Sequence, residues 1–176
     1  LHGRVGKYSH GLLLERFSTC GEDEDPISMA LTSTRRLMRS CGLRTEDVGL
    51  LQVGSSSLLD RSKSMKTELM ALIEAGDYAD LEGVDHYGAS AGGASALMSC
   101  VNWAQGDGWD GRWGVVVCSM DQVAPIGLPL SSASAAAVLV GRGAPLQMGE
   151  AGVHTFEQPR LVGGLRVAPL PVGDPH

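Results

Sequence analysis

The stretch RWGVVVCS, residues 112–119, most constrains the fold, because its centre is an unbroken run of apolar, mostly β-branched residues. Such a run is typical of a β-strand. A second apolar run, VGLLQVG at 48–54, and a third at 133–143 also indicate strands, and residues 81–88 are a weaker strand candidate. The chain is therefore expected to contain a β-sheet. Its fold class depends on which elements separate the strands.

Helical patterns separate these strands. Asp25-Pro26 marks a helix start, with an acid at the N-cap and proline at the first helical position, and Gly42 marks its end. Apolar residues on one face of this helix are Ile27, Ala30, Leu31, Leu37, Met38 and Cys41. A second helical face consists of Met65, Leu69, Leu72 and Ile73. With a third helix expected over about 90–104, the alternation predicts an α/β layered fold around a mainly parallel sheet.

Length and composition restrict the function classes. The chain has 176 residues, enough for a sizeable core, with 43% hydrophobic and 19% charged residues, which is typical of a globular protein. A net charge of −6 with scattered basic residues argues against nucleic acid as a partner. No apolar run approaches the roughly 20 residues of a membrane span, and residues 1–10, which carry charge without an apolar core, are not expected to be a signal peptide. Because the chain begins with leucine, we expect a fragment or a processed product.

The four cysteines lie far apart in the sequence, at Cys20, Cys41, Cys100 and Cys118. None belongs to a C-x-x-C pair, so no zinc or other metal site is expected. Sparse, unpaired cysteines fit a reducing compartment such as the cytoplasm, where most of them would be small buried apolar residues.

A G-x-S-x-G pattern occurs at residues 88–92, with Ser90 at its centre. Here a strand gives way to a helix N-terminus, whose backbone N–H groups favour developing negative charge. That geometry suits a serine nucleophile. The favoured interpretation is that small residues let the helix and the sheet approach each other, since short Gly/Ser patterns recur by chance.

A hydrolase would also need an acid and a base. Acids that follow Ser90 are Asp107, Asp110 and Asp121, and the histidine candidates are His154 and the nearer His86. Each has an ordinary structural explanation, so the case for a hydrolase is weak. Residues 60–66 mix charges ahead of a helix; Ser62 or Ser64 could cap it, and the cations could meet an anionic ligand, although a solvated helix start is favoured.

Several further stretches occur together in one order and spacing. The most specific are Val101-Asn102-Trp103 followed by Trp109-Asp110-Gly111-Arg112, with Glu82-Gly83-Val84-Asp85 and Gly92-Gly93 upstream. From about residue 5 to His154 the chain thereby resembles the N-terminal half of the 3-hydroxy-3-methylglutaryl-CoA synthase family, in the thiolase-like superfamily. The resemblance implies an α/β thiolase-like fold in which this chain is one incomplete half, without the first strand and the C-terminal half. It also implies a domain over 1–154 and an irregular Pro/Gly-rich tail over 155–176.

The resemblance implies an acyltransferase that condenses acetyl-CoA with acetoacetyl-CoA in the mevalonate pathway to isoprenoid precursors. In the family a cysteine in Asn-Ala-Cys-x-Gly-Gly is acetylated, a glutamate is the general acid/base, and a C-terminal histidine assists. Here Ser90 occupies the cysteine position and Ser56 the glutamate position. A family aspartate corresponds to Met120, and an Arg-Pro-Thr-Gly-Gly loop corresponds to residues 130–134.

These replacements predict a divergent or truncated member with impaired or no activity. A serine hydroxyl needs an adjacent base, whereas a thiol at a helix N-terminus gives a usable thiolate. Ser56 cannot serve as that base. No covalent cofactor is expected, and acyl-CoA would be the substrate of an active enzyme. Two alternatives are a non-catalytic partner subunit in a homo- or hetero-oligomer that uses the thiolase-like dimer surface, and a thioester or ester hydrolase that uses Ser90.

Overall fold

The computed structural model describes Ser18, Asp60 and residues 20–58, 62–73, 80–88, 91–121 and 133–145. In these residues four strands form one sheet in the order β2-β1-β3-β4. The strands are β1 (Val48–Ser55), β2 (Glu82–Tyr87), β3 (Trp113–Met120) and β4 (Ser134–Val140). β1 runs parallel to β2 and β3, and β4 is antiparallel to β3. The predicted α/β fold with a mainly parallel sheet is confirmed, whereas the expected boundary at residues 154/155 lies outside the described residues.

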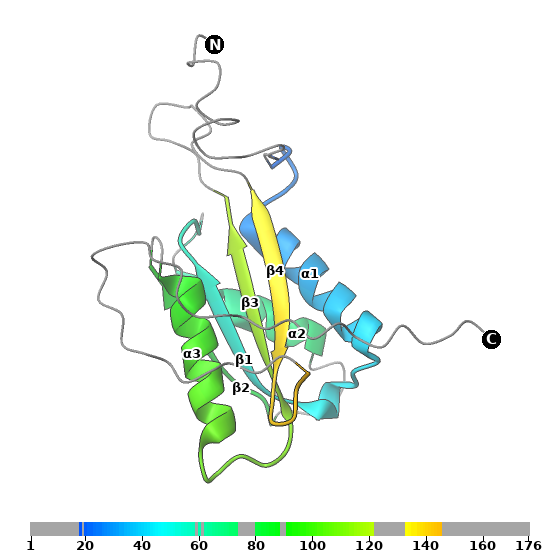
Figure 1. The fold of residues 1–176 in the computed structure, drawn as a ribbon. Helices are drawn as coiled ribbons and strands as arrows, with labels where there is room; N and C mark the ends of the chain where they lie inside the picture. The colour runs from blue at the N-terminus through cyan, green and yellow to red at the C-terminus, as the bar shows by residue number, and fades with distance from the viewer. Residues whose placement is uncertain are drawn as a thin grey trace, which may run out of the picture.

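Three α-helices cover the two faces of the sheet (Figure 1). α1 (Pro26–Cys41) and α2 (Met65–Ile73) contribute to the larger core on one face, and α3 (Gly92–Gln105) packs on the other. The 3₁₀ turn η2 (Thr45–Asp47) leads directly into β1. Two layers of helix around one sheet explain why the central strands read as nearly continuous apolar runs.

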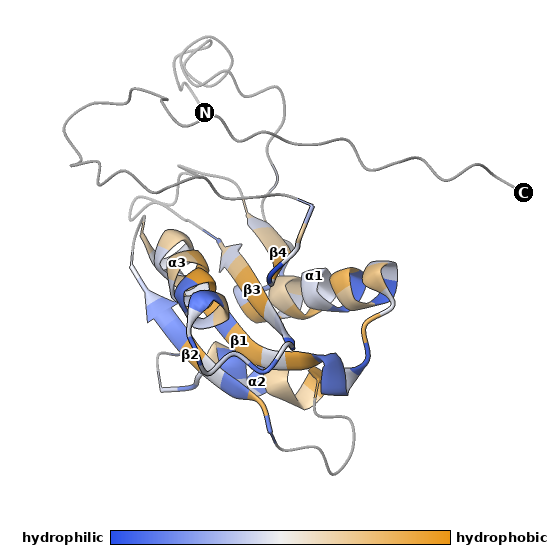
Figure 2. Ribbon diagram, turned by 60° about the horizontal axis from the view of Figure 1, so that its bottom comes forward, coloured by the Kyte–Doolittle hydropathy of each residue, from blue (hydrophilic) through white to orange (hydrophobic). Residues whose placement is uncertain are grey.

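β1 is the most enclosed strand, since all eight of its residues are buried. Leu51 and Val53 join the core under α1 and α2, whereas Leu50 joins the core under α3. This division follows from the alternation of side chains along a strand. In Figure 2 the apolar colour accordingly follows β1 and β3 through the middle of the layers.

The ends of α1 are those predicted from the sequence. Asp25 accepts a hydrogen bond from the Ser28 backbone N–H at 2.7 Å, and the Ser28 hydroxyl accepts one from the Asp25 N–H, which completes a capping box. Gly42 ends the helix in the left-handed conformation at φ 61°. Cys41, which the apolar pattern placed on the buried face, is exposed at the last position of the helix.

The start of α2 is capped partly from another strand. Ser64 Oγ accepts a hydrogen bond from the Thr67 N–H at 3.4 Å, which agrees with one of the two predicted caps. Ser62 instead donates to Asp60. The Lys66 N–H donates to Asp85 Oδ1 on β2 at 2.9 Å, so a carboxylate nineteen residues away supplies the second cap.

α3 approaches β1 closely where two glycines meet. A Cβ atom on Gly54 would lie 2.7 Å from Gly93 Cα, and a Cβ on Gly93 would lie 2.8 Å from Cys118 Sγ. Both distances are shorter than real Cβ contacts allow. The glycines therefore permit the close packing of helix on sheet that was expected of residues 92 and 93.

Candidate active site

A recess of about 240 Å³ lies where β1 and β3 end and α3 begins. Its described lining consists of small or uncharged side chains from these elements and from β4: Gly54, Ser55, Ser56, Gly88, Gly92, Gly93, Ala94, Cys118, Ser119, Met120, Ser134, Ala135 and Ala136. The ends of neighbouring parallel strands meet at one edge of a sheet, which is where ligands commonly bind in α/β folds. None of the described lining residues is acidic or basic.

Ser56 follows β1 directly and lines the recess. Its Oγ is buried and has no hydrogen-bond partner among the described residues. The two neighbouring serines differ, because Ser55 Oγ accepts from the Ser57 N–H and Ser57 Oγ accepts from the Asp121 N–H. A hydroxyl can accept or donate a hydrogen bond but, unlike a carboxylate, it cannot take up a proton as a general base near neutral pH. The lining therefore has a polar atom at position 56 but no general base there.

Cys118 is the thiol of the recess. It lies on β3, and burial raises the pKa of its thiol above the usual value. Cys100, on α3, is fully buried, and burial raises its pKa to about 12. Both side chains therefore remain neutral thiols near pH 7, and the thiolate is the nucleophilic form.

Ser90 lies outside the described residues, whereas Gly88, Ala91 and Gly92 nearby are described. Gly88 and Gly92 both line the recess. α3 begins at Gly92 after Ala91, whose side chain makes no cap hydrogen bond. The flanks of Ser90 and the side chain of Ser56 thus share one recess. Met120, in the position of the family aspartate, lines it as well.

Of the three acids considered for a hydrolase, Asp107 and Asp110 lie in the loop between α3 and β3, whereas Asp121 follows β3. Asp121 follows β3 near the recess, where its backbone N–H donates to Ser57 Oγ at 2.7 Å. Asp110 precedes β3 and therefore lies at the opposite end of that strand. His154 lies outside the described residues, as does Ser90. The hydrolase hypothesis consequently stays a prediction.

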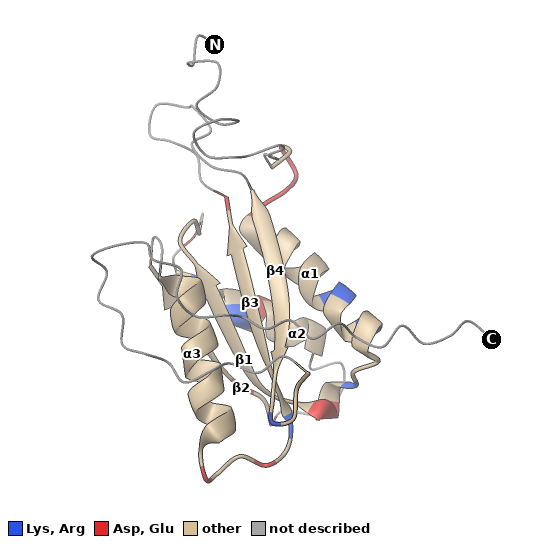
Figure 3. Ribbon diagram, in the orientation of Figure 1, with Lys and Arg blue, Asp and Glu red and all other residues tan. Residues whose placement is uncertain are grey.

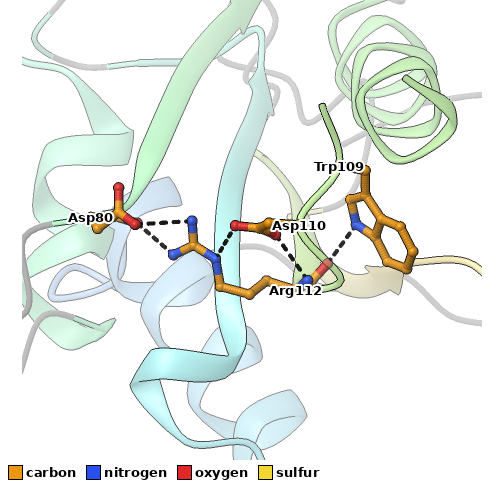
Figure 4. A network of polar contacts seen from close by, with 4 residues as sticks. All are labelled: Asp80, Trp109, Asp110 and Arg112. Carbon is orange, nitrogen blue, oxygen red and sulfur yellow. Dashed lines mark hydrogen bonds and ion pairs between the residues drawn. The ribbon is translucent and has the colours of Figure 1, made fainter. Parts of the chain in front are cut away.

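Asp110 belongs to a network with Asp80, Trp109 and Arg112, hereafter the Arg112 network (Figure 4). Arg112 Nε donates to Asp110 Oδ2 at 2.6 Å, and Nη2 lies 3.1 Å from Asp80 Oδ2. Trp109 Nε1 donates to the Arg112 carbonyl oxygen at 2.8 Å. Arg142 lies 4.8 Å from the Trp109 ring and donates to the last carbonyl groups of α3.

The Arg112 network lies far from the recess. Charged residues gather around the end of the sheet where β3 begins and α3 ends (Figure 3). This is the Trp-Asp-Gly-Arg motif that carried the family resemblance. Its observed contacts connect three chain segments to one another, so its role here is structural.

A chain of three polar side chains crosses the face of the sheet under α3. His86 Nε2 bonds to Gln52 Oε1, and His86 Nδ1 lies 3.0 Å from Ser95 Oγ. Of these three residues, the sequence patterns point only to His86. A glutamine inside the apolar run 48–54 was the one signal that could have pointed to it, since a buried amide needs a partner.

A larger, open groove of about 1220 Å³ lies between α1 and β4. Among its lining residues are Glu24, Arg36 and Arg39, but neither Ser56 nor any described neighbour of Ser90. The smaller recess is therefore the candidate active site. In the described part of the chain no group of three or more His, Cys, Asp or Glu residues could hold a metal ion.

The described helices are too short or too polar for a membrane crossing.

The architecture is that of a thiolase-like fold. The solved structure of MvaS in complex with 3-hydroxy-3-methylglutaryl coenzyme A superposes with a TM-score of 0.69 and 28% identity, over 82% of this chain and 35% of that chain.

Sequence comparison identifies the family. Residues 2–145 match the model of the hydroxymethylglutaryl-coenzyme A synthase N-terminal domain. The mitochondrial hydroxymethylglutaryl-CoA synthase of Homo sapiens is 40% identical over 154 residues, 85% of this chain and 30% of that protein. Hydroxymethylglutaryl-CoA synthase erg13A of Aspergillus fumigatus is 41% identical over 148 residues, 83% of this chain and 31% of that protein. The chain belongs to the hydroxymethylglutaryl-CoA synthase family and spans under a third of the length of these relatives.

Proposed function

We propose that this chain retains a recess for an acyl thioester, such as an acyl-CoA, but does not carry out the condensation of acetyl-CoA with acetoacetyl-CoA. The observation that carries the proposal is the chemistry of the recess. Ser56 stands where the family resemblance places a glutamate, and no described lining residue is acidic or basic. Removing a general acid/base typically lowers a rate by about 10²–10⁴-fold.

The nucleophile position adds to this loss. Ser90 lacks the acidity of a thiol, and the described recess offers no histidine or carboxylate to activate it. Cys118 does not substitute for the missing cysteine, since burial raises its pKa. All four cysteines are free, which supports a reducing compartment such as the cytoplasm as the site of action.

The test is acetyl transfer to the full chain. After incubation with acetyl-CoA, fragmentation should locate no acetyl group on Ser90 of the unaltered chain, whereas Ser90→Cys should gain one on residue 90. Adding Ser56→Glu to Ser90→Cys tests whether the general acid/base position can be restored. Ser40→Cys, an exposed cysteine on α1, is the matched control and should remain unacetylated. A stable acetyl-Ser90 in the unaltered chain would contradict the proposal.

A non-catalytic partner subunit is the second candidate, because one edge of the described sheet carries exposed apolar side chains. β2 is an edge strand in the observed order, and Val84 and Tyr87 on it are 49% and 55% exposed. Met98 on the adjacent α3 is 38% exposed. An edge strand with apolar side chains favours pairing with another chain. The partner would be a second copy or a synthase-like subunit.

Light scattering after size exclusion tests this candidate. We expect the full chain to self-associate, or to associate with a complete synthase, and Val84→Lys to weaken that association because lysine blocks edge pairing. Val138→Lys is the control, since Val138 is 50% exposed on the opposite edge strand, β4. A monomer at every concentration, alone and in the presence of the synthase, would exclude the candidate.

A further inference from the structure

The side chains of Gln52, His86 and Ser95 are connected by hydrogen bonds and lie outside the recess. Gln52 lies on β1 and is 3% exposed, whereas Ser95 lies in the first turn of α3 and is exposed. His86, on β2, lies between them, because β1 and β2 run in parallel with Gly54 opposite His86. Gln52, Gly54 and His86 thus lie on the face of the sheet that α3 covers. None of the side chains of Gln52, His86 and Ser95 lines the recess.

With Gln52 Oε1 facing the imidazole, the tautomer that satisfies both contacts carries its proton on Nε2. Gln52 contributes its carbonyl oxygen, Oε1, which only accepts, so His86 Nε2 must donate. In the neutral imidazole the other nitrogen, Nδ1, then has a free lone pair. Ser95 Oγ lies 3.0 Å from it and can donate its hydroxyl proton. A buried acceptor behind the ring therefore orients His86 as a base toward an exposed serine.

We propose that Ser95 is a histidine-activated nucleophile that accepts the acyl group of an ester or thioester, with Gln52 as the positioning residue. A hydroxyl within hydrogen-bond reach of a base, which is itself oriented by a third group, is the arrangement that nucleophilic catalysis requires. The site is distinct from position 90 and does not depend on the recess. Because Ser95 is exposed, an acyl donor can reach it from solvent.

The acyl transfer balances as follows. Ser95 Oγ forms a bond to the acyl carbon while its proton passes to His86 Nδ1. The bond from that carbon to the leaving oxygen or sulfur breaks, and the leaving group takes the proton back from Nδ1. The products are an acyl ester on Ser95 and a free alcohol or thiol. Water, deprotonated by the same nitrogen, then releases the carboxylic acid and restores the serine.

Reaction of the full chain with p-nitrophenyl acetate tests the proposal. We expect p-nitrophenol release together with an acetyl group that fragmentation locates on Ser95. Ser95→Ala should abolish that label, and His86→Asn should slow its formation by roughly a hundredfold, as loss of a general base does. Ser90→Ala should leave the label in place. Ser40→Ala is the matched control, because Ser40 is an exposed helical serine that donates only to the Leu37 carbonyl.

The positioning role of Gln52 has its own readout. Gln52→Glu keeps an oxygen acceptor behind Nε2 and should preserve labelling of Ser95, whereas Gln52→Leu should lose most of it at equal folded content by circular dichroism. A purely structural role would predict no such rescue. The proposal is overturned if the acetyl group lies only elsewhere, such as on Ser90 or amines, or if His86→Asn labels Ser95 equally fast. If the variants unfold, the position of the acetyl group in the unaltered chain still tests the proposal, since an unlabelled Ser95 refutes it.

Discussion

Ser56 and Ser119 line the same recess but differ in their bonding. Ser56 Oγ is buried without a described partner, whereas Ser119 Oγ donates to the Pro26 carbonyl oxygen at 2.7 Å. Ser119 therefore links β3 to the start of α1. Ser56 Oγ links no described residues to one another, and among them nothing compensates for the removal of its hydroxyl from water, which lowers stability. This difference is expected where a position serves a ligand and not the fold.

Replacing Ser56 and Ser119 by alanine should therefore affect the free energy of unfolding differently. Ser56→Ala should leave the free energy of unfolding unchanged or raise it by up to about 1 kcal/mol, because an unsatisfied hydroxyl is removed. Ser119→Ala, the matched control, should lower it by about 1 kcal/mol or more, because a buried hydrogen bond is lost. Urea denaturation measures both. Equal losses in the two variants would mean that Ser56 has a partner in solution.

The contact between α3 and β1 sets the shape of the recess at the scale of elements. Gly54 and Gly93 let the helix start lie directly on the strand, with Cys118 beneath. The recess therefore exists because β1 and β3 end where α3 begins, and because β1 and α3 carry glycines, Gly54 and Gly93, at that point. A methyl group on Gly54 would have to displace backbone, since its nearest atoms would belong to the main chain of Gly92 and Gly93.

Gly54→Ala should lower the free energy of unfolding by about 1–3 kcal/mol, the usual cost of overpacking a core. Gly108→Ala is the control, because a Cβ there meets nothing within 4 Å, and its effect should stay within about 0.5 kcal/mol. Thermal or urea unfolding distinguishes the two. Equal stability of both variants would show that α3 can move away from β1 freely.

The Arg112 network connects the start of β3 to the chain before β2 and to the loop after α3. Arg112 Nη1 donates to the Asp80 carbonyl oxygen at 2.7 Å, and its backbone N–H donates to Asp110 Oδ1 at 3.0 Å. The backbone hydrogen bond from Arg112, aided by its side chain, holds the pKa of Asp110 below its usual range. The network thus depends on an ionised carboxylate.

Acid should weaken this network in a defined direction. A carboxyl group whose pKa is lower in the folded state stabilises the fold above its unfolded pKa of about 3.9, and that contribution disappears as the pH falls through the folded value. The stability difference between the unaltered chain and Asp110→Asn should therefore shrink as the pH falls from about 5 toward 2. Urea unfolding across that range measures it, and Arg112→Gln should reduce the difference. A pH-independent difference would contradict this assignment.

Much of the fold could be predicted from local patterns. The capping signal at Asp25-Pro26, the stop at Gly42 and the apolar run at 112–119 each correspond to an observed boundary within a few residues. These features depend on neighbours in the chain, so a short window contains them. The family motifs predicted the thiolase-like class for the same reason, since they are read residue by residue.

The sequence by itself determined the order of helices and strands, the family, and the serines at positions 56 and 90. Only the tertiary structure decided which polar groups meet. Asp85 caps α2 from β2, Ser119 bonds to Pro26, and Gln52 orients His86 toward Ser95. Such pairs form between residues that are distant in the chain, where strand register and helix packing set the distances. A hydrogen bond requires those distances to within a few tenths of an ångström, and no local pattern specifies them.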